Sequence, residues 1–302
     1  MEFKDVTDVQ ERLEKADYIP SREIATVVFL AEATGKPILV EGPAGVGKTE
    51  LAKAVARSLN RELIRLQCYE GLDEAKALYE WEYAKQLLYT QMVKEKISDV
   101  IAGAHTLTEA VDKIAAQDDA FFSERFLQPR PLLQAISSEQ PVVLLIDEVD
   151  KSDPEFEAFL LELLSDFQVT IPELGTRRAN KIPFVVLTSN NYRDMSDALK
   201  RRCIHIYIDY PERDLEIRIV RLKIPGIEGR LVEKIVDAIR RIRNLDLKKR
   251  PCISETLDWA HSLIALHVED LSREVLMDTL NVICKHRTDS EKVKGSLQSI
   301  LH

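Results

Sequence analysis

The stretch that decides the fold of this chain is Gly42-Pro43-Ala44-Gly45-Val46-Gly47-Lys48-Thr49. It matches the phosphate-loop pattern G-x-x-x-x-G-K-[ST] at every position. An apolar run ends at Val40, and a helical pattern follows the loop with its apolar residues on one face. Glycines let backbone N–H groups close around phosphate oxygens at the positive end of such a helix. The stretch therefore predicts a phosphate site, in which Lys48 contacts the outer phosphates and Thr49 supplies a hydroxyl to Mg²⁺.

A second chemical signal is the pair Asp147-Glu148, which directly follows the apolar run Val142 to Ile146. A buried strand that ends in two carboxylates places both at the edge of a sheet. Beside a phosphate loop, we expect Asp147 to hold Mg²⁺, directly or through water, and Glu148 to orient and polarise an attacking water. On its own, the pair would be equally consistent with a solvated acidic strand end.

A third signal is the run Ser189-Asn190-Asn191, which ends another apolar strand pattern, Phe184 to Thr188. In an AAA+ sheet, which these three segments resemble, the polar side chain here lies between the loop and the acidic pair and can fix the water or the γ-phosphate. The resemblance implies this role for Asn190, with Asn191 as the alternative. The competing interpretation is a turn, because asparagine tolerates positive φ.

Two arginines, Arg201 and Arg202, close a short helical pattern that begins near Asp197. A helix C-terminus favours cations, so complementation of the helix dipole is the simpler interpretation. The functional interpretation is an arginine finger that reaches the γ-phosphate of a neighbouring subunit, with Arg202 as the first candidate and Arg201 as the second.

The chain reads as an α/β core followed by a small helical domain. Continuous apolar strands separated by helices predict a parallel sheet that is covered on both faces. The five predicted strands are Pro37–Val40, Leu63–Leu66, Val142–Ile146, Phe184–Thr188 and Cys203–Ile208. Beyond Pro211 only helical patterns remain, around 212–224, 229–243, 254–266 and 272–286. We therefore divide the chain into a core at 1–209 and a helical lid at 210–302.

Composition narrows the class of protein. The 302 residues are 45% hydrophobic and 31% charged, which is typical of a globular and not a disordered chain. The net charge of -9 argues against nucleic acid as the main partner. The four cysteines show no metal-binding spacing, which favours buried free thiols. The N-terminus lacks a signal pattern and no apolar run could span a membrane, so we expect a cytoplasmic protein.

Taken together, these segments resemble the AAA+ superfamily over nearly the whole chain. The matching segments are EGPAGVGKTELAKAVA, VVLLIDEVDKSDPEFEAFLLELLSDFQVTI, FVVLTSNN and ALKRRC. Within AAA+, the run Asp166 to Pro172 and the Phe184 strand are similar to the MoxR group. In that group this stretch is a β-hairpin, which we place at about 167–183 with Arg177 and Arg178 near its tip.

The stretch from Cys68 to Pro131 is similar to the CoxD-like branch of that group. The resemblance rests on the segments 68–73 and 78–87. It implies an insertion at about 68–130 and a role in maturing molybdenum-containing hydroxylases. Trp81 and Tyr83 within it either pack in the insertion's own helices or contact a partner.

Two further positions are compared with the AAA+ pattern. An arginine that the helical domain often supplies to the γ-phosphate is missing, because Ser254 or Glu255 occupies its place and Arg250 is out of register. Gln67, at the end of the second strand, has the position to hydrogen-bond Glu148 and hold it away from water until a partner binds. Solvation of a strand end is the simpler interpretation of that residue.

The resemblance implies an ATP- and Mg²⁺-dependent ATPase that acts as a hexameric ring and remodels a client metalloenzyme. A protein with a von Willebrand A domain would be its partner. The alternative is a nucleic-acid motor or loader, which the basic Arg177-Arg178 pair keeps open. A nucleotide-gated scaffold with slow turnover ranks third, because Glu148 and Asn190 are both present.

Overall fold

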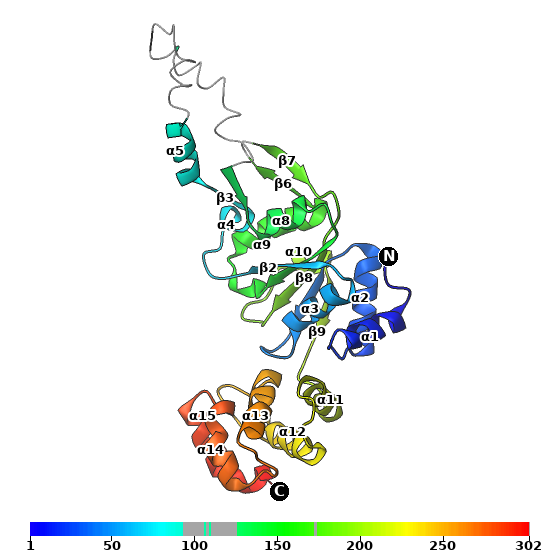
Figure 1. The fold of residues 1–302 in the computed structure, drawn as a ribbon, viewed down its shortest axis with the longest axis vertical. Coiled ribbons are helices and arrows are strands. Elements are labelled where there is room, and N and C mark those ends of the chain that lie inside the picture. The colour runs from blue at the N-terminus through cyan, green and yellow to red at the C-terminus, as the bar shows by residue number, and fades with distance from the viewer. Residues whose placement is uncertain (93–105, 107–108, 110–125, 172–173, 302) are drawn as a thin grey trace.

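A five-stranded parallel sheet forms the centre of the larger domain (Figure 1). The computed structural model describes residues 1–92, 106, 109, 126–171 and 174–301. The spatial order of the sheet is β2-β5-β8-β1-β9. The strands are β1 (Ile38–Glu41), β2 (Glu62–Gln67), β5 (Val142–Asp147), β8 (Phe184–Ser189) and β9 (Ile204–Tyr207). All neighbouring pairs are parallel, which confirms the predicted sheet.

Helices cover both faces of this sheet (Figure 1). Successive residues of β5 enter different hydrophobic clusters: Leu144 and Ile146 face one, and Val143 and Leu145 face the other. Because side chains alternate across a strand, a strand that is buried throughout needs a layer on each side. One layer contains α1 (Val6–Lys15), α2 (Arg22–Thr34) and α3 (Lys48–Ser58). The other contains α4 (Glu74–Leu78), α8 (Pro131–Ser137), α9 (Pro154–Asp166) and α10 (Asp197–Arg202).

The register of the strands brings the predicted chemical groups to one edge. Glu41, the last residue of β1, pairs with Ser189, and Gln67, the last residue of β2, pairs with Asp147. Parallel strands end at the same edge of their sheet, so the segments that follow β1, β5 and β8 meet there. The short 3₁₀ helix η3 (Val149–Lys151) then leads from β5 towards α9.

The residue before α9 holds a distant loop and does not cap the helix. Asp153 is the N-cap residue and Pro154 opens the helix, but the Asp153 side chain makes no capping hydrogen bond. Its Oδ2 instead accepts the backbone N–H of Gly71 at 3.2 Å. The carboxylate therefore fastens the loop after β2 to the start of α9.

A two-stranded antiparallel hairpin lies between α9 and β8. Its strands are β6 (Gln168–Ile171) and β7 (Gly175–Arg178), and the turn residues 172–173 lie outside the described part of the chain. Arg177 pairs with Val169 and Arg178 with Gln168, whereas Gly175 pairs with Ile171 next to the turn. The two arginines are thus exposed at the base of the hairpin and not near its tip, so the basic tip expected from the sequence is wrong.

The predicted insertion falls largely on residues outside the described part of the chain. Its described ends form β3 (Tyr79–Trp81) and β4 (Leu127–Pro129), which pair antiparallel, and α5 (Tyr83–Met92). The rings of Tyr79 and Trp81 meet edge to face with centroids 6.0 Å apart. Tyr83 is 68% exposed, so it does not pack in the described structure.

The C-terminal part of the chain is an all-helical domain with its own core (Figure 1). Its helices are α11 (Arg213–Lys223), α12 (Gly229–Arg243), α13 (Ile253–Ala265), α14 (Arg273–Ile283), α15 (Arg287–Gly295) and α16 (Leu297–Leu301). The last two are additional to the four predicted. Fully buried Trp259 donates its indole N–H to Thr279 Oγ1 at 2.8 Å, which joins α13 to α14.

A buried ion pair fixes the first two helices of this domain. Arg243 donates to both carboxylate oxygens of Glu216, at 2.7 and 2.6 Å, and both side chains are at most 7% exposed.

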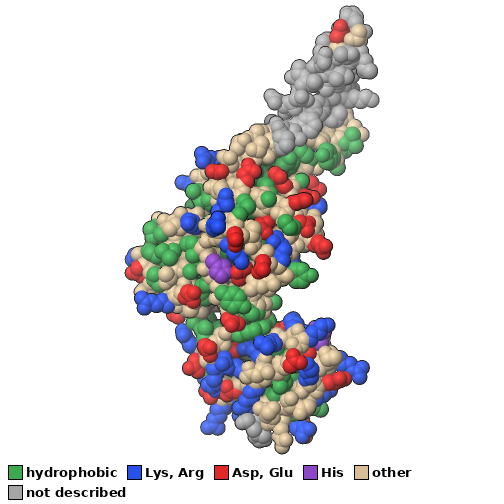
Figure 2. Space-filling view, turned by 180° about the vertical axis from the view of Figure 1, so that it is seen from behind, with side chains coloured by type: hydrophobic (Ala, Val, Ile, Leu, Met, Phe, Trp, Pro, Cys, Tyr) green, Lys and Arg blue, Asp and Glu red, His purple; other side chains and the backbone are tan. Residues whose placement is uncertain are grey.

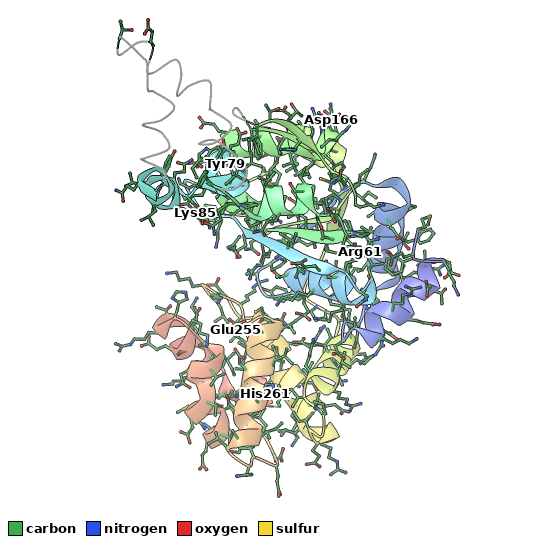
Figure 3. The ribbon with its side chains drawn as sticks, turned by 45° about the horizontal axis from the view of Figure 1, so that its top comes forward. Arg61, Tyr79, Lys85, Asp166, Glu255 and His261 are labelled. Atoms are coloured by element: carbon green, nitrogen blue, oxygen red, sulfur yellow. The ribbon has the colours of Figure 1, made fainter. Side chains whose placement is uncertain are left out.

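Figure 2 shows the helical domain as a separate lower lobe beneath the core. Glu255, at the start of α13, lies on the side of that lobe that faces the core (Figure 3). The four cysteines are free and buried, as expected.

Candidate nucleotide site

The phosphate loop closes on its own lysine. Gly47 has φ 101° and is the N-cap residue of α3, so Lys48 and Thr49 form the first turn of that helix. Lys48 Nζ donates to the carbonyl oxygens of Gly42 at 2.7 Å and Pro43 at 2.6 Å, and to Asn190 Oδ1 at 2.8 Å. Lys48 is 5% exposed, and this burial lowers its pKa to about 8. Because the ammonium has little water around it, a contact with phosphate would be strengthened.

Two glycines of the loop are required by close approaches. A Cβ at Gly42 would lie 2.0 Å from the carbonyl oxygen of Ile208, and one at Gly45 would lie 2.0 Å from Cys252 Sγ. Both residues also have positive φ, at 146° and 75°. The loop thus packs directly between the end of β9 and the first turn of α13, with no space for side chains.

Asp147 is held by hydrogen bonds to both of its carboxylate oxygens. Oδ1 accepts from the hydroxyls of Thr49 at 3.0 Å and Thr188 at 2.6 Å. Oδ2 accepts from Arg65 Nη2 at 2.6 Å and Nε at 3.0 Å. Asp147 is 2% exposed, so its orientation is fixed with Thr49, the other predicted metal ligand, beside it.

Glu148 is fixed by three side chains and by its backbone. Its φ of 56° is left-handed, a conformation that costs a non-glycine residue about 1–2 kcal/mol. The backbone N–H donates to Thr188 Oγ1 at 2.9 Å. Among the side chains, Asn190 donates to Oε1 at 3.0 Å, while Gln67 at 2.9 Å and Lys151 donate to Oε2. The Gln67 contact envisaged from the sequence is therefore present.

Asn190 bridges the loop and the acidic pair, because its amide contacts both Lys48 and Glu148. Asp150 holds it there: Asp150 Oδ2 accepts the backbone N–H groups of Asn190 and Tyr192, each at 2.9 Å. Asp150 is 1% exposed, and its Oδ1 has no partner among the described residues. Asn191 has φ 59° and occupies the turn itself.

Sequence reasoning missed four residues of this network. Thr188 carries a hydroxyl, whereas the four strand residues before it, Phe184 to Leu187, are apolar. This difference in the sequence could have identified it. Arg65, Asp150 and Lys151 carried no motif that separated them from solvated charges. The roles of Arg65 and Asp150 depend on β2 lying beside β5 and on the loop after β8 folding over η3, whereas Lys151 pairs locally with Glu148, three residues before it.

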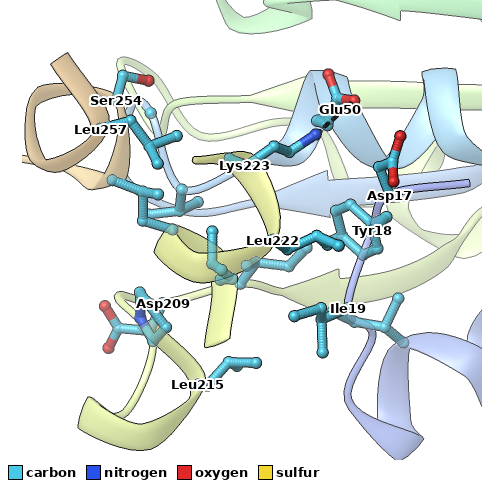
Figure 4. A pocket seen from close by; sticks show the side chains of 18 residues that line it. Asp17, Tyr18, Ile19, Glu50, Asp209, Leu215, Leu222, Lys223, Ser254 and Leu257 are labelled. Carbon is cyan, nitrogen blue, oxygen red and sulfur yellow. Dashed lines mark ion pairs between the residues drawn. The ribbon is translucent and has the colours of Figure 1, made fainter. Parts of the chain in front are cut away.

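An apolar cavity of about 250 Å³ adjoins the loop (Figure 4). Tyr18 and Ile19 line it from the segment after α1, Val46 lines it from the loop, and Leu222 and Leu257 line it from the helical domain. Burial raises the pKa of the Tyr18 hydroxyl above its usual value. The faces of a planar aromatic ring system fit such a lining.

A second cavity of about 270 Å³ surrounds the loop's polar groups. Lys48, Thr49, Asp147, Glu148 and Asn190 all line it. The two cavities share four lining residues: Gly45, Gly47, Glu50 and Ser254.

The first turn of α13 is the part of the helical domain closest to the phosphate loop. Exposed Ser254 lines both cavities, whereas Arg250 lines neither. Glu255 is turned away: it accepts the backbone N–H of Cys252 at 3.0 Å and the ammonium of Lys249 at 3.1 Å. Burial raises the pKa of the Cys252 thiol, which donates its hydrogen to the same carboxylate. The side chain that this turn offers to the phosphate cavity is thus a neutral hydroxyl.

The two arginines of α10 lie outside the phosphate cavity and are exposed. Arg202 Nε donates to Ser165 Oγ at 2.7 Å and its Nη1 to the Ala198 carbonyl at 3.1 Å. The chain just before α10 is fastened to α9, because Glu157 accepts the backbone N–H of Ser196 at 2.8 Å and Arg193 Nη1 at 2.7 Å. Burial opposes ionisation of Glu157, but these hydrogen bonds hold its pKa below the usual value.

The residues present fit a nucleotide with Mg²⁺. The loop offers backbone N–H groups and Lys48 to phosphate oxygens. Thr49 and Asp147 place two oxygen atoms 3.0 Å apart, and oxygen is the ligand that Mg²⁺ prefers. The adjoining apolar cavity suits a base. Asn190 lies between Lys48 and Glu148 and contacts both.

Several known proteins are similar to this chain in sequence. Gas vesicle ATPase GvpN of Haloferax mediterranei is 26% identical over 258 residues, which cover 81% of this chain and 66% of that protein. GvpN1 of Halobacterium salinarum is 28% identical over 69% of this chain and 57% of its own length. The chaperone ClpB of Mycoplasmoides gallisepticum is 28% identical over 62% of this chain and 20% of its own length. This chain thus spans less than two thirds of each of these relatives.

A solved structure of a RuvB variant from Thermotoga maritima has the same fold. It superposes with a TM-score of 0.50 at 18% identity and covers 92% of this chain and 72% of that chain. No helix in the described part of the chain has the length and apolarity to cross a membrane. Residues 38–210, more than half of the chain, match the ATPase family associated with various cellular activities (AAA). The chain therefore belongs to the AAA family of ATPases.

Proposed function

We propose that this AAA ATPase couples ATP hydrolysis to the remodelling of a protein complex, and that it works as a ring. The observation that carries the proposal is the Asn190 amide, which contacts both Lys48 and Glu148. A single side chain thereby links the group that would bind the terminal phosphate to the carboxylate that would polarise water. This arrangement favours turnover over the slow nucleotide-gated scaffold.

In this proposal each residue has one task. Bound Mg²⁺ would neutralise charge on the β- and γ-phosphates. Thr49 and Asp147 would hold it, Lys48 and the loop N–H groups would hold the phosphates, and Glu148 would take the proton of the attacking water. The apolar cavity would receive the adenine.

The position of α10 supports the proposed ring. Arg201 and Arg202 are exposed and lie outside their own subunit's phosphate cavity, so an arginine finger from this helix would act on the site of a neighbour. We keep Arg202 as the first candidate and Arg201 as the second. Six subunits is the expected number, by resemblance to the superfamily.

Protein clients are favoured over nucleic acid. The similarity to a gas vesicle ATPase and to Clp chaperones supports work on protein assemblies. The net charge of -9 disfavours binding to a phosphate backbone. Arg177 and Arg178, which kept the nucleic-acid alternative open, lie at the base of the hairpin.

The narrower proposal concerns the client. By resemblance to the CoxD-like branch of the MoxR group, the client is a molybdenum-containing hydroxylase, and a protein with a von Willebrand A domain is the partner. The support for this branch is the sequence of the segments 68–73 and 78–87, and most of the insertion lies outside the described residues.

The test is co-expression of a molybdenum hydroxylase and a von Willebrand A protein from the genome that encodes this chain. Wild-type protein should give metal-loaded hydroxylase, and Glu148→Gln should give empty hydroxylase. Equal loading with both would refute the proposed client. ATP hydrolysis that rises on adding DNA and falls with salt would instead support the nucleic-acid motor.

A further inference from the structure

Arg65 belongs to none of the sequence motifs, yet its guanidinium contacts Asp147, the predicted metal ligand. Arg65 lies on the edge strand β2, and its guanidinium donates twice to Asp147 Oδ2, at 2.6 and 3.0 Å. Since Thr49 and Thr188 occupy Oδ1, each carboxylate oxygen of Asp147 already accepts two hydrogen bonds. The outward-facing oxygen is thus committed to Arg65.

The same guanidinium reaches the catalytic side of the acidic pair. Its Nη2 also donates to Gln67 Oε1, and Gln67 Nε2 donates to Glu148 Oε2 at 2.9 Å. Arg65 and Gln67 are two residues apart on one strand, so their side chains lie on the same face. One arginine therefore contacts Asp147 directly and Glu148 through a single amide.

Arg65 has space to leave Asp147. Its side chain is 48% exposed, whereas that of Asp147 is 3% exposed. It lines a cavity of about 750 Å³ between β2, α4 and β3, together with Tyr69, Tyr79 and Arg130. The Asp147 carboxylate is therefore held in place, whereas the Arg65 side chain has room to move away from it.

We infer that Arg65 is a positioning residue that competes with Mg²⁺ for Asp147 and so sets the metal affinity of the site. Arg65 lies on Oδ2 of Asp147, whereas the oxygen beside Thr49 is Oδ1, so a guanidinium and a divalent cation would repel each other across one carboxylate. When metal enters with the nucleotide, Arg65 turns into the cavity beside β2, and Gln67 loses the partner that orients it towards Glu148. This inference rests on the proposed assignment of Asp147 as a metal ligand.

The experiment measures Mg²⁺ dependence without turnover. A fluorescent, non-hydrolysable ATP analogue is bound at fixed concentration while Mg²⁺ is titrated, and the half-saturating Mg²⁺ concentration is recorded. Arg65→Met removes the charge at similar length and should lower that concentration about fivefold, the size expected for a partly exposed ion pair. Arg65→Lys keeps the charge and should stay close to wild type.

Arg130→Met is the matched control, because Arg130 lines the same cavity but pairs with Glu80. It should leave the half-saturating Mg²⁺ concentration unchanged. A folded Arg65→Met protein, verified by its melting curve, with unchanged or higher Mg²⁺ requirement overturns the inference. Arg65→Gln replaces it in the titration if Arg65→Met does not fold.

Asp147→Asn tests the assignment of Asp147 as a metal ligand separately from the role of Arg65. It should raise the half-saturating Mg²⁺ concentration in a chain with Arg65 intact. If it does not, the assignment of Asp147 as metal ligand is wrong, and the role of Arg65 fails with it. If Asp147→Asn behaves as expected while Arg65→Met has no effect, only the role of Arg65 is refuted.

Discussion

Two regions of the molecule hold their polar side chains in different ways. One is the sheet edge with Lys48, Glu148 and Asn190, and the other is the end of α10 with Arg201 and Arg202. At the sheet edge every functional side chain is held by others of the same chain, and Asp147 and Lys48 are at most 5% exposed. At the end of α10 both arginines are exposed, and among the described residues Arg202 is held by Ser165 and by its own helix. One chain thus has a buried, hydrogen-bonded phosphate-loop edge and an exposed arginine pair, which is the arrangement that the proposed completion of the site by a second copy requires.

Loss of the finger should have the largest effect. Arg202→Ala should retain ATP binding and lose hydrolysis by a factor on the order of 10³ or more, because transition-state charge on the γ-phosphate is then not neutralised. Mixing it with Lys48→Ala should restore part of the ATPase rate, since the latter subunit lends its arginine. Steady-state ATPase assays of single and mixed variants measure this.

Arg201→Ala and Lys200→Ala are the companions of that variant on the same helix. Lys200→Ala should keep wild-type activity. If Arg202→Ala stays active and Arg201→Ala does not, the finger is Arg201. If no mixture recovers activity although the subunits co-assemble, the division of the site between copies is wrong.

Glu148→Gln tests the finished half of the site. It should lower turnover by a factor of about 10²–10⁴, because the general base is lost, while ATP still binds. Equilibrium binding and single-turnover hydrolysis separate these effects. Glu155→Gln, an exposed carboxylate in the first turn of α9, serves as the control. Near-normal turnover in Glu148→Gln would remove this residue from the mechanism.

Asp150→Ala should release the loop that presents Asn190. Two backbone N–H groups then lose their acceptor, and we expect hydrolysis to fall about tenfold through a displaced Asn190 amide. Asp150→Asn keeps one oxygen for the same two donors and should restore most of the rate. A kcat loss with little change in KM would support positioning, whereas equal rates for Asp150→Ala and wild type would contradict it.

Ser165→Ala should have the smallest effect of these variants. It tests whether the hydrogen bond that holds Arg202 within its own subunit affects hydrolysis. Ser165 accepts from Arg202 and donates to the Leu161 carbonyl, so its removal breaks one of the two hydrogen bonds of Arg202 and leaves the one to the Ala198 carbonyl. A few-fold change in ATPase rate is expected if Arg202 is the finger, the size of one hydrogen bond. Ser262→Ala, a serine in α13 with the same bond to its own helix, is the control and should change nothing.

Much of the site was predictable because its signals are contiguous. The phosphate loop lies within one short segment, and the acidic pair and Asn190 each follow directly from an apolar strand. Parallel strands end at one edge of their sheet, so these groups had to meet once the strands were recognised. The four predicted helices of the C-terminal domain could be recognised for the same local reason, since their apolar periodicity lies within each helix, as in α12.

The contacts of Arg65, Gln67, Thr188 and Asp150 were decided by the tertiary structure. Gln67 meets Glu148, and Arg65 meets Asp147, only because β2 lies beside β5 with Gln67 opposite Asp147. Cys252 and Ser254 reach the phosphate loop only because α13 is placed against Gly45. A local pattern specifies what a segment becomes, because backbone geometry repeats within a helix or strand. Which charges then pair depends on packing between distant segments, and a single sequence carries no local signal for that choice.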